Sequence, residues 1–128
     1  GIKDGLPHDW GTKSWPNGDY SSGEYRDGKL NGYGKIKMTT PEGVGTVEGQ
    51  FRDDALEGEG TVVRPNGTVH SGFFTAGQLN GAGTLMQADG TRYVGQFKNG
   101  RFDGEGLLTN IENGFEYVGD FQNHLFPI

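Results

Sequence analysis

The sequence of 128 residues contains no cysteine, which excludes disulfides, iron–sulfur clusters and thiolate zinc sites. No apolar run approaches the ~20 residues of a membrane-spanning helix, and no segment has the periodicity of an amphipathic helix. Basic residues are scarce, since 11 Lys and Arg stand against 17 Asp and Glu and give a net charge of −6. We therefore expect no nucleic-acid partner, and tight electrostatic binding to anionic lipid is disfavoured.

Glycine is abundant, with 25 residues, and five of them recur at intervals of 26, 23, 23 and 24 residues, each followed two places later by an aromatic ring. These pairs are Gly23–Tyr25, Gly49–Phe51, Gly72–Phe74, Gly95–Phe97 and Gly119–Phe121. Seven places after each leading glycine stands a large apolar residue: Leu30, Leu56, Leu79, Phe102 and Phe126. Self-similarity at such a period is typical of repeat proteins, whose units bury their apolar faces by stacking on one another.

Within each unit, runs such as 93–97 alternate with the period of a half-buried strand, and dipeptides such as Asn99-Gly100 favour tight turns. We predict an all-β fold, an elongated single-layer twisted antiparallel sheet of tandem β-hairpins. Residues 1–128 form one array in this prediction. Its parts are an N-terminal half-repeat 1–17, repeats starting near 18, 44, 67 and 90, and a partial C-terminal repeat 114–128.

The motif Tyr-x-Gly-x-aromatic, followed by Asn-Gly and Gly-x-Gly, resembles the MORN (membrane occupation and recognition nexus) repeat over nearly the whole chain. The sequence departs from it where Ser21, Val47 and His70 replace the expected tyrosine, where Asp54 replaces a turn glycine, and where three residues are inserted after Thr39. We expect local irregularity there. Residues 4–8 and 53–58 also resemble the MORN-bearing N-terminal region of a SET-domain lysine methyltransferase.

Enzyme motifs are nearly absent, and we expect no catalytic residue, no cofactor and no metal. The segment 43–49 lacks the spacing and the Lys-Ser/Thr of a phosphate loop. His8, His70 and His124 are far apart, so a surface or structural role is favoured over metal binding. The acidic cluster around Asp53 and Glu59 has no apparent apolar pocket that would raise a carboxyl pKa.

Alternation places a strip of apolar residues on the face opposite the aromatic column, and such a strip indicates an interaction site. The alternative is that a flanking segment or the twist of the sheet covers it. We predict an extended or helical protein segment as partner. The expected anchors are Tyr33, Val63, Phe73, Met86 and Leu107, and Glu48, Glu59 and Glu105 would steer basic groups. Because terminal strands have unpaired edges, we also expect homodimers through Tyr117, Phe121 and Phe126.

The resemblance implies a non-catalytic protein-interaction or scaffold module. The alternatives are a phospholipid- or membrane-contacting module and the regulatory or substrate-recruiting arm of an enzyme such as a SET-domain methyltransferase. Since the first residue is Gly1, we expect an excised or processed piece, from which a targeting signal could have been removed. The expected location is cytoplasmic, with cytoskeletal or membrane association as alternatives.

Overall fold

The computed structural model describes residues 2–3, 6–7 and 9–124, and its regular structure is entirely β. Two short strands, β1 (Ile2–Lys3) and β2 (Leu6–Pro7), pair with each other. The main sheet contains β3 (Asp9–Ser14), β4 (Tyr20–Arg26), β5 (Lys29–Thr40), β6 (Gly43–Arg52), β7 (Ala55–Val63), β8 (Val69–Thr75), β9 (Gln78–Met86), β10 (Thr91–Lys98), β11 (Arg101–Asn110) and β12 (Phe115–His124).

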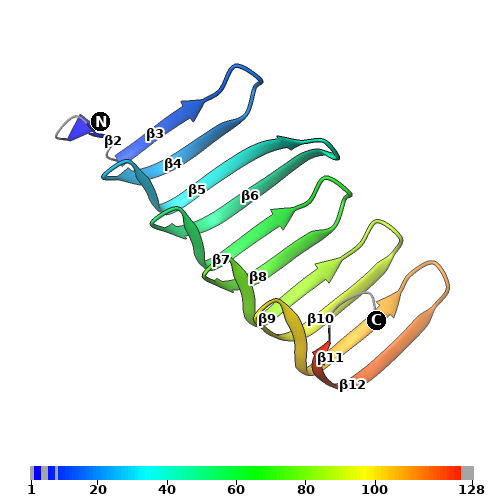
Figure 1. Ribbon diagram of the computed structural model, residues 1–128. Coiled ribbons are helices and arrows are strands. Elements are labelled where there is room, and N and C mark those ends of the chain that lie inside the picture. The colour runs from blue at the N-terminus through cyan, green and yellow to red at the C-terminus, as the bar shows by residue number, and fades with distance from the viewer. Residues whose placement is uncertain (1, 4–5, 8, 125–128) are drawn as a thin grey trace.

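Spatial order follows chain order from β3 to β12, and every neighbouring pair is antiparallel, which gives the long open ribbon of Figure 1. The predicted all-β array of tandem hairpins is confirmed. Among the described residues, no helix is long and apolar enough to cross a membrane.

The two long edges of the ribbon differ. Along the tight-turn edge, at the lower left of Figure 1, four two-residue turns close the hairpins: Asp27–Gly28, Asp53–Asp54, Ala76–Gly77 and Asn99–Gly100. All eight residues have positive φ, between 48° and 82°, as a type I′ turn requires. Along the other edge, the loop edge, turns of four or five residues connect the hairpins, except that only Pro41 and Glu42 lie between β5 and β6.

Each hairpin also bends near its tight turn. The pairing register shifts directly after the leading glycine, as between Gly23 and Tyr25. A Cβ on Gly34 would come within 3.0 Å of Leu30 Cδ2 and 3.2 Å of Phe51 Cδ1. Glycine therefore leaves room for leucine as well as for rings. The tight-turn ends curl over one side of the sheet (Figure 1), which we call the concave face, and the other side is the open face.

The core lies under these curled ends. It consists of Tyr25, Leu30, Phe51, Leu56, Phe74, Leu79, Leu85, Tyr93, Phe97, Phe102 and Phe121. The predicted aromatic and leucine columns thus close one face of the sheet, as far as the described residues reach.

Backbone hydrogen bonds connect each tight turn to the neighbouring unit. Gly77 N donates to Leu56 O at 3.1 Å, and Gly100 N donates to Leu79 O at 2.9 Å. Asp54 N likewise donates to Leu30 O at 3.0 Å, while Leu30 N donates to the Asp54 carboxylate at 2.8 Å. Each unit is therefore held to the previous one by main-chain bonds as well as by apolar packing.

The expected irregularity at Asp54 is wrong. Asp54 adopts φ 71°, so it takes over the left-handed conformation of the missing glycine. At the insertion the unit does differ from the others, because the β5–β6 ladder continues without a register shift to the pair Thr40 and Gly43 and leaves a turn of two residues. An antiparallel hairpin can lengthen in this way because added residues simply continue the pairing.

Candidate interaction surface

The open face carries a shallow depression of about 410 Å³ across strands β5 to β8. We call it the acidic depression. Its lining consists of Tyr33, Glu48, Gly49, Gln50, Glu59, Gly60, Thr61, Ser71, Gly72 and Phe73. The depression thus brings together four of the eight residues expected to bind a partner. They are Tyr33, Glu48, Glu59 and Phe73.

The strand register explains this grouping. Tyr33 on β5 lies opposite Gln50 on β6, and Glu59 on β7 lies opposite Phe73 on β8. Since neighbouring strands are ~4.8 Å apart, Tyr33 and Phe73 bracket the depression from about 14 Å apart. Phe73 is 48% exposed although it is a large apolar side chain. The side chain directly after it, Phe74, points to the other face and is buried in the core.

Tyr33 is held from three sides. Its hydroxyl donates a hydrogen bond to the Glu48 carboxylate, which raises the pKa of the phenol above its ordinary value of 10.0. Its amide donates to Glu24 at 2.8 Å. The Trp10 ring stacks against it, with centroids 6.3 Å apart and planes 15° apart. The ring is thus positioned in advance at one end of the depression.

The two glutamates differ in their surroundings. Glu48 accepts the Tyr33 hydroxyl and lies opposite Lys35 on the neighbouring strand. The Glu59 side chain is exposed and has no hydrogen-bond or ion-pair partner within the described part of the chain. Glu59 is therefore the carboxylate most available to a basic group.

A second feature of the open face is an aliphatic strip on β7 to β12. It consists of Val63, Val69, Met86, Val94, Leu107 and Val118. Val69 lies between Val63 and Met86 in the register, and Leu107 lies between Val94 and Val118. The other expected anchors, Val63, Met86 and Leu107, belong to this strip. Glu105 lies beside it, opposite Asp120 on the next strand.

Strand β12 forms one edge of the sheet. Of the residues expected to mediate self-association, Tyr117 is 44% exposed, whereas Phe121 is buried in the core. Phe126 lies outside the described residues. Val118, with 72% of its surface exposed, offers the edge a further apolar contact.

Most carboxylates of the acidic cluster, residues 53–59, accept hydrogen bonds at the tight turns. Asp53 and Asp54 hydrogen-bond to the preceding unit, and Glu57 accepts from the Ala76 amide at 2.9 Å. Only Glu59 of this cluster lines the depression. Nowhere within residues 9–124 do three His, Asp or Glu side chains gather in a way that would hold a metal ion.

The sequence reasoning passed over Trp10, Gln50, Thr61 and Ser71. Trp10 could have been found, because it stands 23 residues before Tyr33 and so occupies the equivalent position of the preceding unit. Polar residues such as Ser71 carry no comparable signal, since strand faces in contact with water are ordinarily polar.

A comparison with curated proteins found no match. The family model of the MORN repeat matches residues 22–39, 48–69, 70–92 and 93–110, which together make up more than half of the chain. These four segments fall on the hairpins β4–β5, β6–β7, β8–β9 and β10–β11. The match covers repeats alone and adds no support to the resemblance to a SET-domain methyltransferase. The chain belongs to the MORN-repeat family.

Proposed function

We propose that this chain is a non-catalytic protein-interaction module whose open face binds a segment with basic and apolar side chains. The observation that carries the proposal is the acidic depression between two exposed rings, Tyr33 and Phe73. A purely solvated sheet face would not be expected to keep a large ring 48% exposed at the rim of a hollow, as Phe73 is.

The spacing of the rings suggests how the partner lies. An extended chain rises about 3.3 Å per residue, so apolar residues four positions apart would reach both rings. The intervening residues would then pass over Glu48 and Glu59, where lysine or arginine finds charge complementarity. A helix rises ~1.5 Å per residue and would need anchors about ten positions apart.

The test uses a defined probe, the peptide acetyl-Leu-Lys-Arg-Lys-Leu-amide, and measures its dissociation constant by calorimetry. We expect Phe73→Ala to weaken binding about thirtyfold, as truncation of a central anchor by 2 kcal/mol or more would do. Phe115→Ala is the matched control, because Phe115 is a similarly exposed ring outside the depression. A peptide with alanine in place of both leucines should bind more weakly to the unchanged protein.

Contact with phospholipid is the alternative, supported by Lys35 and Lys37, which lie on the open face. It predicts binding to phosphatidylserine vesicles that depends on these lysines. If Phe73→Ala and Met86→Ala both bind the basic peptide like the wild type while vesicles bind through Lys35 and Lys37, the peptide proposal fails. If the chain is instead the recruiting arm of an enzyme, the same open face would bind the substrate, and a separate catalytic domain would carry out the reaction.

We further propose that β12 pairs with a second copy of the chain. Among the described residues no strand pairs with the outer edge of β12, and Tyr117 and Val118 expose apolar surface on this strand. Light scattering should report a dimer at high protein concentration, and Val118→Lys should shift it to monomer, because edge lysines oppose strand pairing. A strict monomer in both proteins would overturn this proposal.

A further inference from the structure

The concave face contains a hollow of about 630 Å³, on the side of the sheet opposite the acidic depression. We call it the basic hollow. Its lining consists of Val62, Arg64, His70, Phe74, Gly77, Gln78, Leu79, Asn99, Gly100 and Arg101. Two arginines and a histidine thus converge, without a carboxylate in the lining, in a chain whose net charge is −6.

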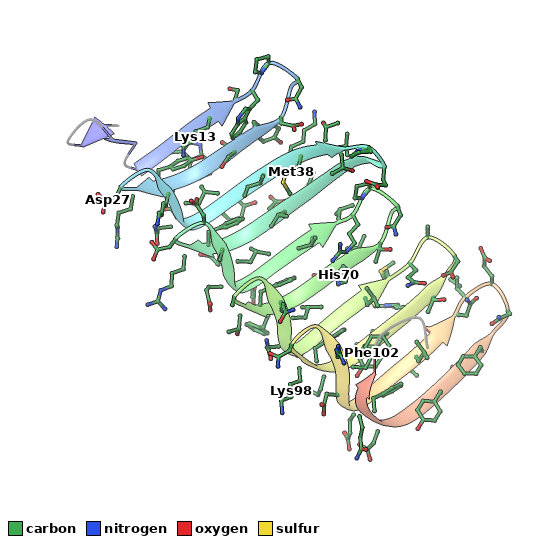
Figure 2. The ribbon with its side chains drawn as sticks, viewed as in Figure 1. Lys13, Asp27, Met38, His70, Lys98 and Phe102 are labelled. Atoms are coloured by element: carbon green, nitrogen blue, oxygen red, sulfur yellow. The ribbon has the colours of Figure 1, made fainter. Side chains whose placement is uncertain are left out.

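His70, in the lining of the hollow, stands at the position that Tyr93 occupies in the next unit. At the equivalent position, Tyr93 is fully buried, stacks on Phe102 with centroids 3.8 Å apart and donates its hydroxyl to Gln96 O at 2.8 Å. The imidazole of His70 is shorter than a phenol and leaves that space open. Figure 2 shows His70 on β8 in the middle of the array, with Phe102 near the curled end of a later hairpin.

The basic groups present hydrogen-bond donors to this space. Arg64 Nε donates to His70 Nε2 at 3.2 Å, so the neutral imidazole carries its proton on Nδ1. Within residues 9–124, no further partner engages the Arg64 guanidinium or His70 Nδ1, and the Arg101 guanidinium has none. The carboxylate of Glu57, which is not part of the lining, accepts a hydrogen bond from the amide of Ala76, the residue before Gly77.

The floor of the hollow is apolar. Phe74 and Leu79 belong to the buried core, and Val62 packs against it. A hollow of this size, with an apolar floor and a few convergent donors, is typical of sites for small groups or for one or two side chains. Guanidinium groups bind carboxylate and phosphate through paired, charge-assisted hydrogen bonds.

We propose that the basic hollow binds an acidic peptide segment, in which a carboxylate or phosphate bonds to Arg64, Arg101 and His70 Nδ1 and an adjacent apolar side chain packs on Phe74 and Leu79. The concave groove of a repeat array accommodates an extended chain. A bilayer surface presents many negative charges at once, which a chain of charge −6 repels, whereas a peptide brings only one or two.

The first experiment titrates the whole chain with three peptides, acetyl-Leu-Glu-Phe-amide, its glutamine counterpart and its phosphoserine counterpart, and follows the imidazole signal of His70 by NMR. We expect the glutamate or the phosphoserine peptide to move this signal. The glutamine peptide should bind at least about tenfold more weakly, because it lacks the charge that the arginines recognise. The comparison between glutamate and phosphoserine shows which oxyanion is preferred.

Variants then locate the site. Arg64→Gln and Arg101→Gln should each weaken binding about tenfold or more, whereas Arg92→Gln removes the same charge from the open face and should leave the affinity unchanged within about twofold. His70→Tyr should fill the hollow and abolish binding while the chain stays folded; calorimetry measures binding here, because this variant lacks the His70 signal, and a denaturation curve checks the folding. The basic peptide of the open face should bind all four variants normally, so failure here is distinguishable from failure of the proposed function.

Three results would overturn the inference. The first is that the glutamate and glutamine peptides bind equally well. The second is that Arg92→Gln weakens binding as much as Arg101→Gln does. In the third, phosphatidylserine vesicles bind in a manner that depends on Arg64 and Arg101 while no peptide binds, which would assign the hollow to lipid headgroups instead.

Discussion

The rings of Tyr93 and Phe102 stack with their centroids 3.8 Å apart and their planes 8° apart. Phe97 and Phe121 meet the Tyr93 ring edge-on, at 5.1 Å and 5.0 Å. Such edge-to-face contacts add to the energy of burial. Four rings from β10, β11 and β12 thus form one packed cluster. The earlier units have Ser21, Val47 and His70 at the position of Tyr93, so they are held together more by leucine packing and turn ladders.

Phe97→Ala should be strongly destabilising. Phe97 is 5% exposed and contacts both Tyr93 and Phe102, so its truncation leaves a cavity within the ring cluster. We expect the free energy of unfolding to fall by about 3–5 kcal/mol in urea denaturation. Phe73→Ala, on the open face, serves as the control and should change it by less than about 1 kcal/mol. Equal midpoints for Phe97→Ala and the wild type would mean that the core lies on the other face.

Ala76→Asn should stabilise the chain. Ala76 has φ 50°, a conformation that costs an alanine about 1 kcal/mol and that asparagine tolerates better. The three equivalent turn positions hold Asp27, Asp53 and Asn99. The backbone amide would still donate to Glu57, so we expect a gain of roughly 0.5–1 kcal/mol in the free energy of unfolding. Ala88→Asn is the control without positive φ, and a gain of equal size there would contradict the turn explanation.

These turns show why much of the fold follows from the sequence. Dipeptides such as Asp27-Gly28 and Asn99-Gly100 favour positive φ, and the glycine and aromatic columns fix which residues share a face. Asp54 could not be predicted from composition alone, because its carboxylate stabilises the turn through a bond to Leu30 N in the preceding unit. Such contacts between units depend on stacking geometry, which a single unit does not encode.

The candidate surfaces were less predictable. Alternation correctly placed Tyr33 and Phe73 on the open face, but the depression between them depends on the register of four strands. The basic hollow was not predicted, because a surface or structural role was favoured for His70 and no anion site was considered there. His70 lines the hollow together with Arg64 and Arg101. Because these two arginines are far apart in the sequence, only the folded structure shows that all three basic residues lie together.

His70 should make the stability of the chain depend on pH near neutrality. Burial, assisted by the neighbouring Arg64 charge, lowers the pKa of His70 below its ordinary value of 6.5. Between the folded pKa and about 6.5 the unfolded chain therefore binds more protons than the folded chain, so the free energy of unfolding falls as the pH drops from about 6.5 to the folded pKa and levels off below it. His70→Gln removes this titration, so its urea midpoint should change less than that of the wild type between about pH 7.5 and 5.5. Parallel changes in the two proteins would contradict the assignment.

Glu59→Gln should alter how binding of the basic peptide acetyl-Leu-Lys-Arg-Lys-Leu-amide responds to salt. Glu59 is exposed and its side chain has no partner among the described residues, so its charge acts mainly through long-range attraction, which salt screens. Stopped-flow association rates measured from about 0.05 to 0.5 M NaCl should show a shallower decline for Glu59→Gln than for the wild type. Glu112→Gln removes the same charge from the loop edge and should retain the wild-type slope. Dissociation should change little, because the anchoring rings Tyr33 and Phe73 are intact in both variants. If the association rates of Glu59→Gln and the wild type depend equally on salt, the acidic depression is not the docking site, whatever the affinity of the peptide.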